Sequence, residues 1–302
     1  MPRSLLVVDH FAPEGPALRA HLDRRFAEPG AARAGRFVWD WWHVPGQYTA
    51  LRTPAWSYFP RGVYAAFHRR LVWWGRRVLG CHDISPPWIS CYVEGCGQEL
   101  HGDLPHGPWA FSYSLTRWRG RRFQGGETLL LRDSVLDLWS DFRSVRRLER
   151  AELFRSVVPL FGRLAVFDPR IPHAVRTVRG TLDPREGRIA VHGWFVKPRP
   201  FVEGPLAPRE LLSRIGELSE VLRPLLSREP VAGLLSLGFQ VAPGGRAFGV
   251  RVLSDTTRAS SGAEAGRRRL VARVRAAVGR WRFRAQRARS RVTLPLVFER
   301  GG

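Results

Sequence analysis

Two His-x-Asp tripeptides are the first candidates for a metal site, His21-Leu-Asp23 and His101-Gly-Asp103. The first falls in a segment with helical spacing, where positions two apart point about 200° away from each other, so its side chains cannot easily bind one ion. The second falls in an extended segment, where positions two apart lie on one face. His101 and Asp103 are therefore the better candidate pair of ligands.

A third ligand must come from elsewhere in the chain. His173 lies in Pro172-His-Ala-Val175, on a predicted strand just after a turn at Asp168-Pro169. Two histidines and one carboxylate on one face of a metal leave three positions open, which is the arrangement of non-haem Fe(II) oxygenases. Standing alone, His173 would be an ordinary core or surface histidine; its combination with the pair above favours a ligand role.

A predicted strand follows at 188–196, and alternation places Arg188, Ala190, His192 and Trp194 on one face of it. An arginine that points into a barrel is costly unless it meets an anion. Its planar guanidinium suits a carboxylate through two parallel hydrogen bonds.

Taken in order, these residues resemble the prolyl-hydroxylase-like branch of the 2-oxoglutarate/Fe(II) dioxygenases over most of residues 1–200. The resemblance is carried by Tyr92-Val-Glu-Gly95, His101-Gly-Asp103, Phe123-Gln-Gly-Gly-Glu127, Leu164-Ala-Val-Phe167, Pro172-His-Ala-Val175, and Arg188 with Gly193-Trp-Phe195.

The resemblance implies a double-stranded β-helix in which His101, Asp103 and His173 bind Fe(II). It implies that Arg188 holds the distal carboxylate of 2-oxoglutarate, to which Tyr92 adds a hydrogen bond. The activity implied is hydroxylation of a peptidyl residue such as proline, or of a small molecule. O2 is consumed, succinate and CO2 are coproducts, and ascorbate is a candidate accessory reductant.

Several alternatives stay open at this point. The segment between His173 and Arg188 is longer than is usual in this branch and is expected to form an extended hairpin at 179–187, so Arg176, Arg179 and Arg185 are rival carboxylate anchors. Two further histidines, His106 and His192, could enter the site or lie outside it. Three cysteines are too few for a disulfide framework and are expected as buried small hydrophobic residues rather than a zinc site, namely Cys81, Cys91 and Cys96.

The elements that must position these residues are predicted from apolar spacing and turn residues. Helices are expected at 14–25 and at 63–79, the second ending at Gly80. Short strands are expected at 88–93, 110–116, 128–131, 163–167, 173–178 and 188–196. The aromatic-rich stretch 39–58 either lines a substrate groove or packs on the barrel. This order predicts a mainly β jelly roll with flanking helices.

A proline-rich junction at 196–205 suggests a linker at 201–209 between an oxygenase domain at 1–200 and a small α+β domain at 210–302. In the second domain, helices are expected at 211–226 and 268–284, and strands at 235–241, 247–254 and 291–298. The domain resembles the TonB-type C-terminal domain, which implies a protein-interaction module. Trp281 and Phe283 are expected in its core.

The 302-residue chain carries a formal charge of +23, and its basic residues are arginines apart from Lys197. High-GC codon usage is the simplest explanation. A basic helical face built from Arg267, Arg273, Arg280, Arg284 and Arg287 would otherwise suit an acidic partner. No nucleic-acid-binding signature, signal peptide or membrane span is found, so nucleic acid is not an expected partner and a cytoplasmic location is expected. The competing function is a non-catalytic binding protein, either a degenerate oxygenase fold or a basic module that binds nucleic acid or protein.

Overall fold

The computed structural model describes residues 4–27, 38–103, 106–132, 135, 153–228, 230–259 and 264–299. Contacts divide the chain into two compact units. The larger unit comprises Leu5–Leu71 and Ile84–Val196, and the smaller unit comprises Met1–Ser4, Val72–Asp83 and Lys197–Gly302. The smaller unit thus takes in residues 72–83 in addition to the C-terminal part, a grouping that the order of elements along the chain does not suggest.

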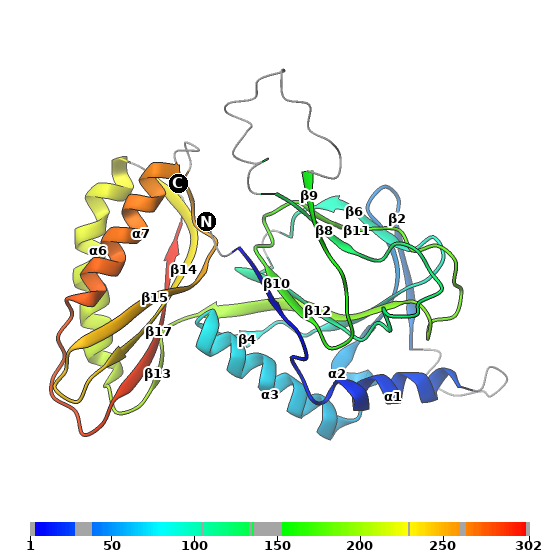
Figure 1. The fold of residues 1–302 in the computed structure, drawn as a ribbon, viewed down its shortest axis with the longest axis horizontal. Helices are drawn as coiled ribbons and strands as arrows, with labels where there is room; N and C mark the ends of the chain where they lie inside the picture. Colours follow the sequence, from blue (N-terminus) through cyan, green and yellow to red (C-terminus); the bar gives the residue numbers. More distant parts are fainter. Residues whose placement is uncertain are drawn as a thin grey trace, which may run out of the picture. The chain divides into compact units, whose positions relative to one another are not determined.

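Eight strands of the larger unit pair in four nested antiparallel couples, β5 with β12, β6 with β11, β7 with β10 and β8 with β9. Because β12 also pairs with β7 and β11 with β8, the strands form two four-stranded sheets, β10-β7-β12-β5 and β6-β11-β8-β9. This is the strand order of a double-stranded β-helix, a jelly roll (Figure 1). The expected fold class is confirmed. The bounds are β5 Trp88–Tyr92, β6 Gly97–His101, β7 Trp109–Ser114, β8 Thr128–Leu131, β9 Phe154–Val157, β10 Leu164–Phe167, β11 His173–Val175 and β12 Arg188–Pro198.

Four further strands extend these sheets. β1 (Leu5–Val8) pairs with β10, and β4 (Cys81–Ile84) pairs with β12. The hairpin of β2 (Asp40–Val44) and β3 (Tyr48–Pro54) joins the two sheets at one edge, because β3 pairs with both β5 and β6. The aromatic-rich stretch 39–58 therefore forms this hairpin and the short helix α2 (Ala55–Tyr58).

The two longer helices of the N-terminal half lie close to their expected positions. α1 spans Gly15–Phe26 and buries Leu18 and Leu22, which are four apart on one face. α3 spans Arg61–Val78. The chain leaves α3 through Gly80 at a φ of +70°, the left-handed conformation expected of a glycine after a helix end.

Aromatic and aliphatic side chains fill the interior of the larger unit. Trp109, Tyr113 and Phe195 are fully buried, and Phe111 is nearly so. The three cysteines are buried and unpaired, as the sequence predicts. Within the described residues, the cysteines belong to no group that could hold a metal ion.

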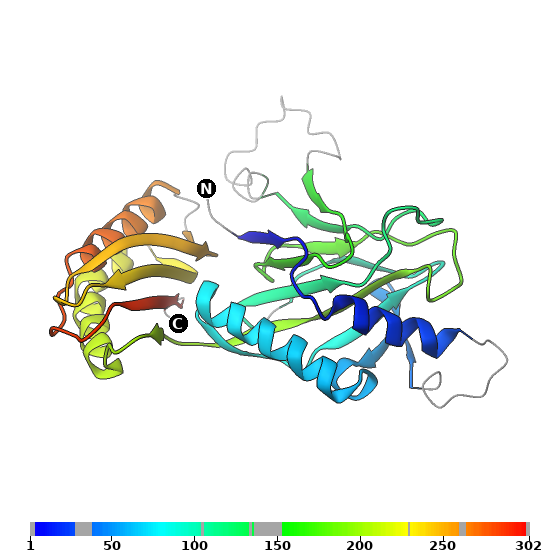
Figure 2. The ribbon, with the colours of Figure 1, turned by 60° about the horizontal axis from the view of Figure 1, so that its bottom comes forward.

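The smaller unit is a four-stranded antiparallel sheet of order β13-β17-β14-β15, with the two-residue β16 beside β14. Two helices pack on one face of the sheet (Figure 2). The core between them is formed by leucines and valines of the helices, such as Leu218 and Val274, and by strand residues such as Leu237. The bounds are β13 Phe201–Glu203, α6 Pro208–Arg228, β14 Val231–Val241, β15 Ala247–Asp255, β16 Arg258–Ala259, α7 Glu264–Gly279 and β17 Ser290–Phe298.

Three features of the smaller unit differ from the expectation. The proline-rich junction is not an open linker throughout, because Phe201–Glu203 pair with β17. α7 ends at Gly279 instead of 284, because Trp281 leaves the helix to pack edge-on against Phe239 in the core. Trp281 is a core residue, as predicted. The expected basic helical face does not form: Arg267 is buried, and three of its arginines lie beyond the helix, namely Arg280, Arg284 and Arg287.

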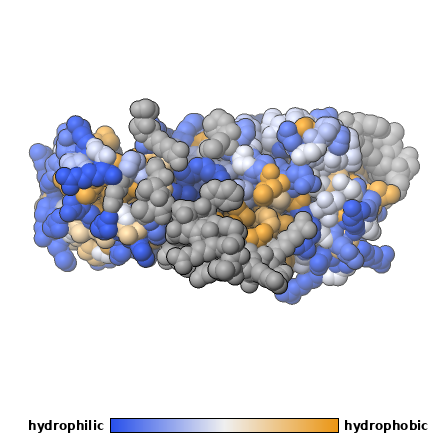
Figure 3. All heavy atoms as spheres, turned by 90° about the horizontal axis from the view of Figure 1, so that it is seen from above, coloured by the Kyte–Doolittle hydropathy of each residue, from blue (hydrophilic) through white to orange (hydrophobic). Residues whose placement is uncertain are grey.

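Within the residues described, no helix combines the length and the apolar character needed to cross a bilayer. Hydrophilic side chains predominate on the face of the molecule drawn in Figure 3, in keeping with the formal charge of +23.

Candidate functional site

The three predicted metal ligands meet because two strands pair. His101 is the last residue of β6 and His173 is the first residue of β11. They face each other in the antiparallel register of these strands, and Asp103 follows two residues after His101. The chain beyond β6 is held by a hydrogen bond from the Asp103 amide to the Pro169 carbonyl, 2.9 Å long. Register and this backbone bond therefore place one carboxylate beside two imidazoles.

The donor atoms of the three side chains form a compact set. Each residue offers one ligand atom, and these atoms all lie within 4.8 Å of one another. The Nε2 atoms of His101 and His173 lie 3.4 Å from the two carboxylate oxygens of Asp103, one each. No other group of three such side chains is found in the described part of the chain. His21 and Asp23 both lie on α1, and Asp23 pairs with Arg19 instead.

Hydrogen bonds on the far side of each imidazole fix its orientation. His101 Nδ1 donates to the carbonyl of Glu99 over 2.8 Å, and His173 Nδ1 donates to the carbonyl of Ile171 over 2.9 Å. Both Nε2 atoms are thereby directed at the shared site, as in metal-binding histidines. The Trp194 indole donates to Asp103 Oδ2 over 3.3 Å and fixes the carboxylate in the same way.

The charges of the group are mutually dependent. Burial opposes ionisation of Asp103, but hydrogen bonds from the two histidines hold its pKa well below the usual range. Burial also opposes protonation of His101, yet the Asp103 carboxylate and the Glu99 carbonyl raise the pKa of that imidazole. The carboxylate is thus ionised, and the site attracts a cation.

Arg188 opens β12 and is 3% exposed. Its Nη2 donates to the Thr128 hydroxyl over 3.2 Å, and its guanidinium lies 4.6 Å from the centre of the Tyr92 ring. Its Nε is buried and has no hydrogen-bond partner. Burial lowers the pKa of this guanidinium, and Tyr92 opposes the shift. Burying a charged guanidinium with an unpaired N–H is costly, and a bound anion would offset this cost.

The three rival arginines are far more exposed and already have acidic partners. The side chains of Arg176 and Arg179 are 58% and 72% exposed and lie near Glu127 and Glu94. Arg185 pairs with Asp183 over 2.7 Å. Residues 179–187 do not form the expected extended hairpin: Arg179 makes an isolated bridge with Gln124, and the turn covers residues 184–186.

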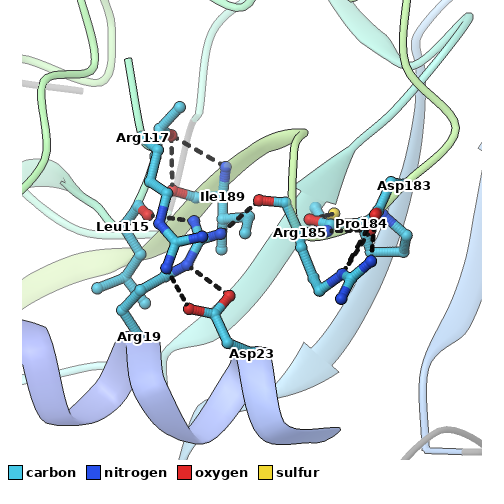
Figure 4. A network of polar contacts seen from close by, with 10 residues as sticks. Arg19, Asp23, Leu115, Arg117, Asp183, Pro184, Arg185 and Ile189 are labelled. Atoms are coloured by element: carbon cyan, nitrogen blue, oxygen red, sulfur yellow. Dashed lines mark hydrogen bonds and ion pairs between the residues drawn. The ribbon is translucent and has the colours of Figure 1, made fainter. Parts of the chain in front are cut away.

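A polar network holds the chain that leads into Arg188 (Figure 4). Arg19, 3% exposed on α1, donates to the carbonyl of Leu115 over 2.8 Å and to the carbonyl of Arg185. The Leu115 amide donates to the Ile189 carbonyl over 2.9 Å. One buried side chain thus fixes both the loop before β12 and the strand beside it. Sequence analysis did not assign a role to Arg19.

The triad and Arg188 line one cavity of about 750 Å³, within the range of small-molecule sites. Tyr92, His106 and His192 line it too, so both of the additional histidines enter the cavity. The His106 ring stacks on Trp194 at 4.4 Å. Arg52 belongs to the stretch 39–58, for which lining a substrate groove was one of two expectations, whereas Trp88, Gln98 and Thr128 were not expected to line the cavity. Trp88 could have been found, because alternation along the predicted strand places it on the same face as Tyr92, a predicted site residue.

The larger unit resembles several solved structures at low sequence identity. The solved structures to which the chain is similar include a prolyl-4-hydroxylase from Pseudomonas putida, at 18% identity and a TM-score of 0.44, covering 65% of this chain and 93% of that one. They also include a prolyl hydroxylase from Trichoplax adhaerens in complex with a hypoxia-inducible-factor peptide, at 14% identity and a TM-score of 0.42, covering 64% and 84%. A third is HygX from Streptomyces hygroscopicus with nickel and 2-oxoglutarate bound, at 17% identity and a TM-score of 0.41, covering 64% and 82%.

No protein-family model and no curated protein matches the sequence. The jelly-roll fold of the larger unit is established by its own strand order, independently of these neighbours.

Proposed function

We propose that the larger unit is an Fe(II)- and 2-oxoglutarate-dependent dioxygenase that hydroxylates a C–H bond. One observation carries the proposal: a single cavity holds two histidines and a carboxylate with converging donor atoms, together with a buried guanidinium whose Nε has no partner. His101, Asp103 and His173 would bind the metal, and Arg188 would bind the cosubstrate.

The residues present fit both groups. Two imidazoles and one carboxylate form the donor set that non-haem Fe(II) enzymes use, and they leave positions open for other ligands. A carboxylate placed against Arg188 would accept a hydrogen bond from the unpaired Nε–H and neutralise the buried positive charge. Tyr92 lies beside the same guanidinium and is the candidate for an additional hydrogen bond.

When bound, Fe(II) would supply the activation of O2, with 2-oxoglutarate oxidised to succinate and CO2 while one oxygen atom enters a substrate C–H bond. The chain's own residues would bind the metal and the cosubstrate and fix the orientation of the metal-binding side chains. The carbonyls of Glu99 and Ile171 hold the two imidazoles, and Trp194 holds the Asp103 carboxylate. Phe167 packs edge-on against His173 at 4.8 Å and helps to exclude water. Ascorbate remains a candidate reductant for keeping the iron reduced.

The decisive measurement is anaerobic titration of the full chain with Fe(II) and 2-oxoglutarate. We expect a visible metal-to-ligand charge-transfer band that is lost in His101→Ala and kept in His43→Ala, a control on the exposed strand β2. On admission of O2 we expect succinate. A wild-type chain that gives neither the band nor succinate contradicts the proposal. A band without succinate favours the alternative, a binding protein with a degenerate oxygenase fold.

The substrate class within this proposal is a peptidyl residue, such as proline, or a small molecule. For the smaller unit we keep the proposal of a protein-interaction module similar to TonB-type C-terminal domains. It is supported by the order of helix, strand, tight turn, strand, helix and closing strand over residues 208–298. The buried free cysteines suit the reducing cytoplasm as the proposed location.

A further inference from the structure

A second guanidinium faces the same cavity without a role in the proposed function. Arg52 lies on β3, lines the cavity, and has a buried Nε with no hydrogen-bond partner. Among the described residues that line the cavity, Asp103 is the only acid. Leaving a buried donor unsatisfied is costly, so the position of Arg52 needs an explanation.

Three aromatic rings surround the Arg52 guanidinium. Its Cζ lies 5.3 Å from the centre of Trp42, 5.5 Å from Trp88 and 5.7 Å from Tyr48. These rings hold the group in place by cation–π contacts, but they accept no hydrogen bond in the plane of the guanidinium. The Nε–H of Arg52 is therefore left without an acceptor, and an anion bound in the cavity would supply one.

The nearest polar neighbour does not neutralise the charge. His192 Nε2 lies 3.5 Å from Arg52 Nη2 and 2.7 Å from the Ser90 hydroxyl. Burial, reinforced by Arg52 and Arg188, lowers the pKa of His192 to about 3, so the imidazole is neutral near pH 7. Arg52 thus keeps a full, uncompensated positive charge.

The net charge of the cavity with Fe(II) and 2-oxoglutarate bound also indicates a missing anion. Fe(II) and Arg188 would bring three positive charges, and Asp103 and the 2-oxoglutarate dianion would bring three negative charges. The positive charge of Arg52 is left over. One further negative charge, supplied by the substrate, would balance the cavity.

The wall beside Arg52 is also suited to a flat apolar group. Trp42 and Trp56 line the cavity while being 37% and 47% exposed, and both pack edge-on against Trp88. Exposed tryptophans grouped around a cavity mark a binding surface more often than a structural one. The exposed parts of these two rings offer apolar contact area beside Arg52.

We propose that Arg52, with Trp42 and Trp56, forms a substrate subsite for a small organic anion that carries an apolar ring, the anion bonding to Arg52. This inference rests on the proposed function and specifies its substrate class. Arg188 serves the cosubstrate and Arg52 serves the substrate.

The test is calorimetric titration of the anaerobic Fe(II)·2-oxoglutarate complex with matched pairs of probes: benzoate, phenylacetate and indole-3-acetate against their primary amides. We expect at least one carboxylate to bind about 10- to 100-fold more tightly than its amide, the range for a hydrogen bond to a charged group. Arg52→Gln should abolish this preference, Arg52→Lys should keep part of it, and Arg61→Gln, on the exposed start of α3, should keep all of it.

The inference is overturned if no carboxylate is preferred over its amide, or if the preference survives in Arg52→Gln. The charge-transfer band is recorded on the same samples. Its absence from the wild-type chain would instead refute the proposed function. Its loss in Arg52→Gln alone would assign Arg52 to the 2-oxoglutarate site and would also overturn the inference.

Discussion

Replacing Arg188 with methionine separates two effects of its guanidinium that have opposite signs. In the ligand-free protein, Arg188 is 3% exposed and has one side-chain hydrogen bond, to Thr128, with its Nε unpaired. Replacing a buried ion pair with well-packed apolar side chains of similar volume is often neutral or stabilises a protein by about 1–4 kcal/mol, and a buried charge with no ionic partner is costlier still to keep. We therefore expect Arg188→Met to be more stable than the wild type without ligand.

The same change should weaken 2-oxoglutarate binding. Removing one partner of a buried charge pair costs about 2–5 kcal/mol, which corresponds to about a 30-fold or greater loss of affinity. Arg188→Lys should fall between the two, because it keeps the charge and loses the planar fork. Arg176→Met removes an arginine whose side chain is 58% exposed and serves as the matched control.

Thermal unfolding with and without anaerobic Fe(II) and 2-oxoglutarate measures both effects. At about 2–4 °C per kcal/mol for a unit of this size, Arg188→Met should start from a higher Tm and gain little from 2-oxoglutarate. The wild type should start lower and gain more. The reasoning is refuted if Arg188→Met is less stable without ligand and binds 2-oxoglutarate as tightly as the wild type does.

Three other changes test different parts of the structure. The pKa of His192 is about 3 in the folded protein and 6.5 in the unfolded chain. Between these pH values only the unfolded chain binds the proton, which favours unfolding. The free energy of unfolding should therefore fall as the pH drops from 6.5 toward 3, by up to about 1.4 kcal/mol per pH unit. Urea unfolding at pH 7 and pH 5 should show a smaller fall in His192→Gln, and an equal fall would contradict the assignment. Arg267→Ala should lower the free energy of unfolding by about 3–5 kcal/mol, because Arg267 pairs with the buried Asp255 over 2.6 Å. Arg268→Ala, at an exposed neighbouring position, should change it little. Equal effects of the two substitutions in denaturant unfolding would refute a stabilising role for the buried pair. Because Asp103 is proposed to bind Fe(II), Trp194→Phe should weaken Fe(II) binding about 10- to 100-fold by releasing that carboxylate. Unchanged affinity would show that this hydrogen bond is not needed.

The parts of the site that sequence could predict are those fixed by local rules. Alternation along 188–196 identifies Arg188 as inward-facing, and the spacing of His101 and Asp103 identifies a convergent pair. The strand at 128–131 was predicted with the bounds that the structure has, because turn residues and apolar positions define both of its ends.

What sequence could not supply depends on contacts between distant segments. Arg52 faces the cavity because β3 pairs with both β5 and β6, which nothing in the local sequence specifies. Likewise, the helical spacing of arginines continues past Gly279, but burial of Trp281 in the core ends the helix there. Tertiary packing overrides propensity in such places.

The nesting of the strand couples has a consequence for how the site forms in time. Ser90 on β5 and His192 on β12 form a hydrogen bond although they are 102 residues apart in the sequence. His101 comes close to His173 only when β6 pairs with β11. Contacts of such sequence separation close late and slowly, because the entropy of the intervening chain must be overcome first. High affinity for the metal should therefore appear only at the end of folding, when all four strand couples have paired. Binding of Fe(II) would then report that the larger unit has completed its folding. A nascent chain that stops before residue 173 has two of the three ligands and no closed cavity.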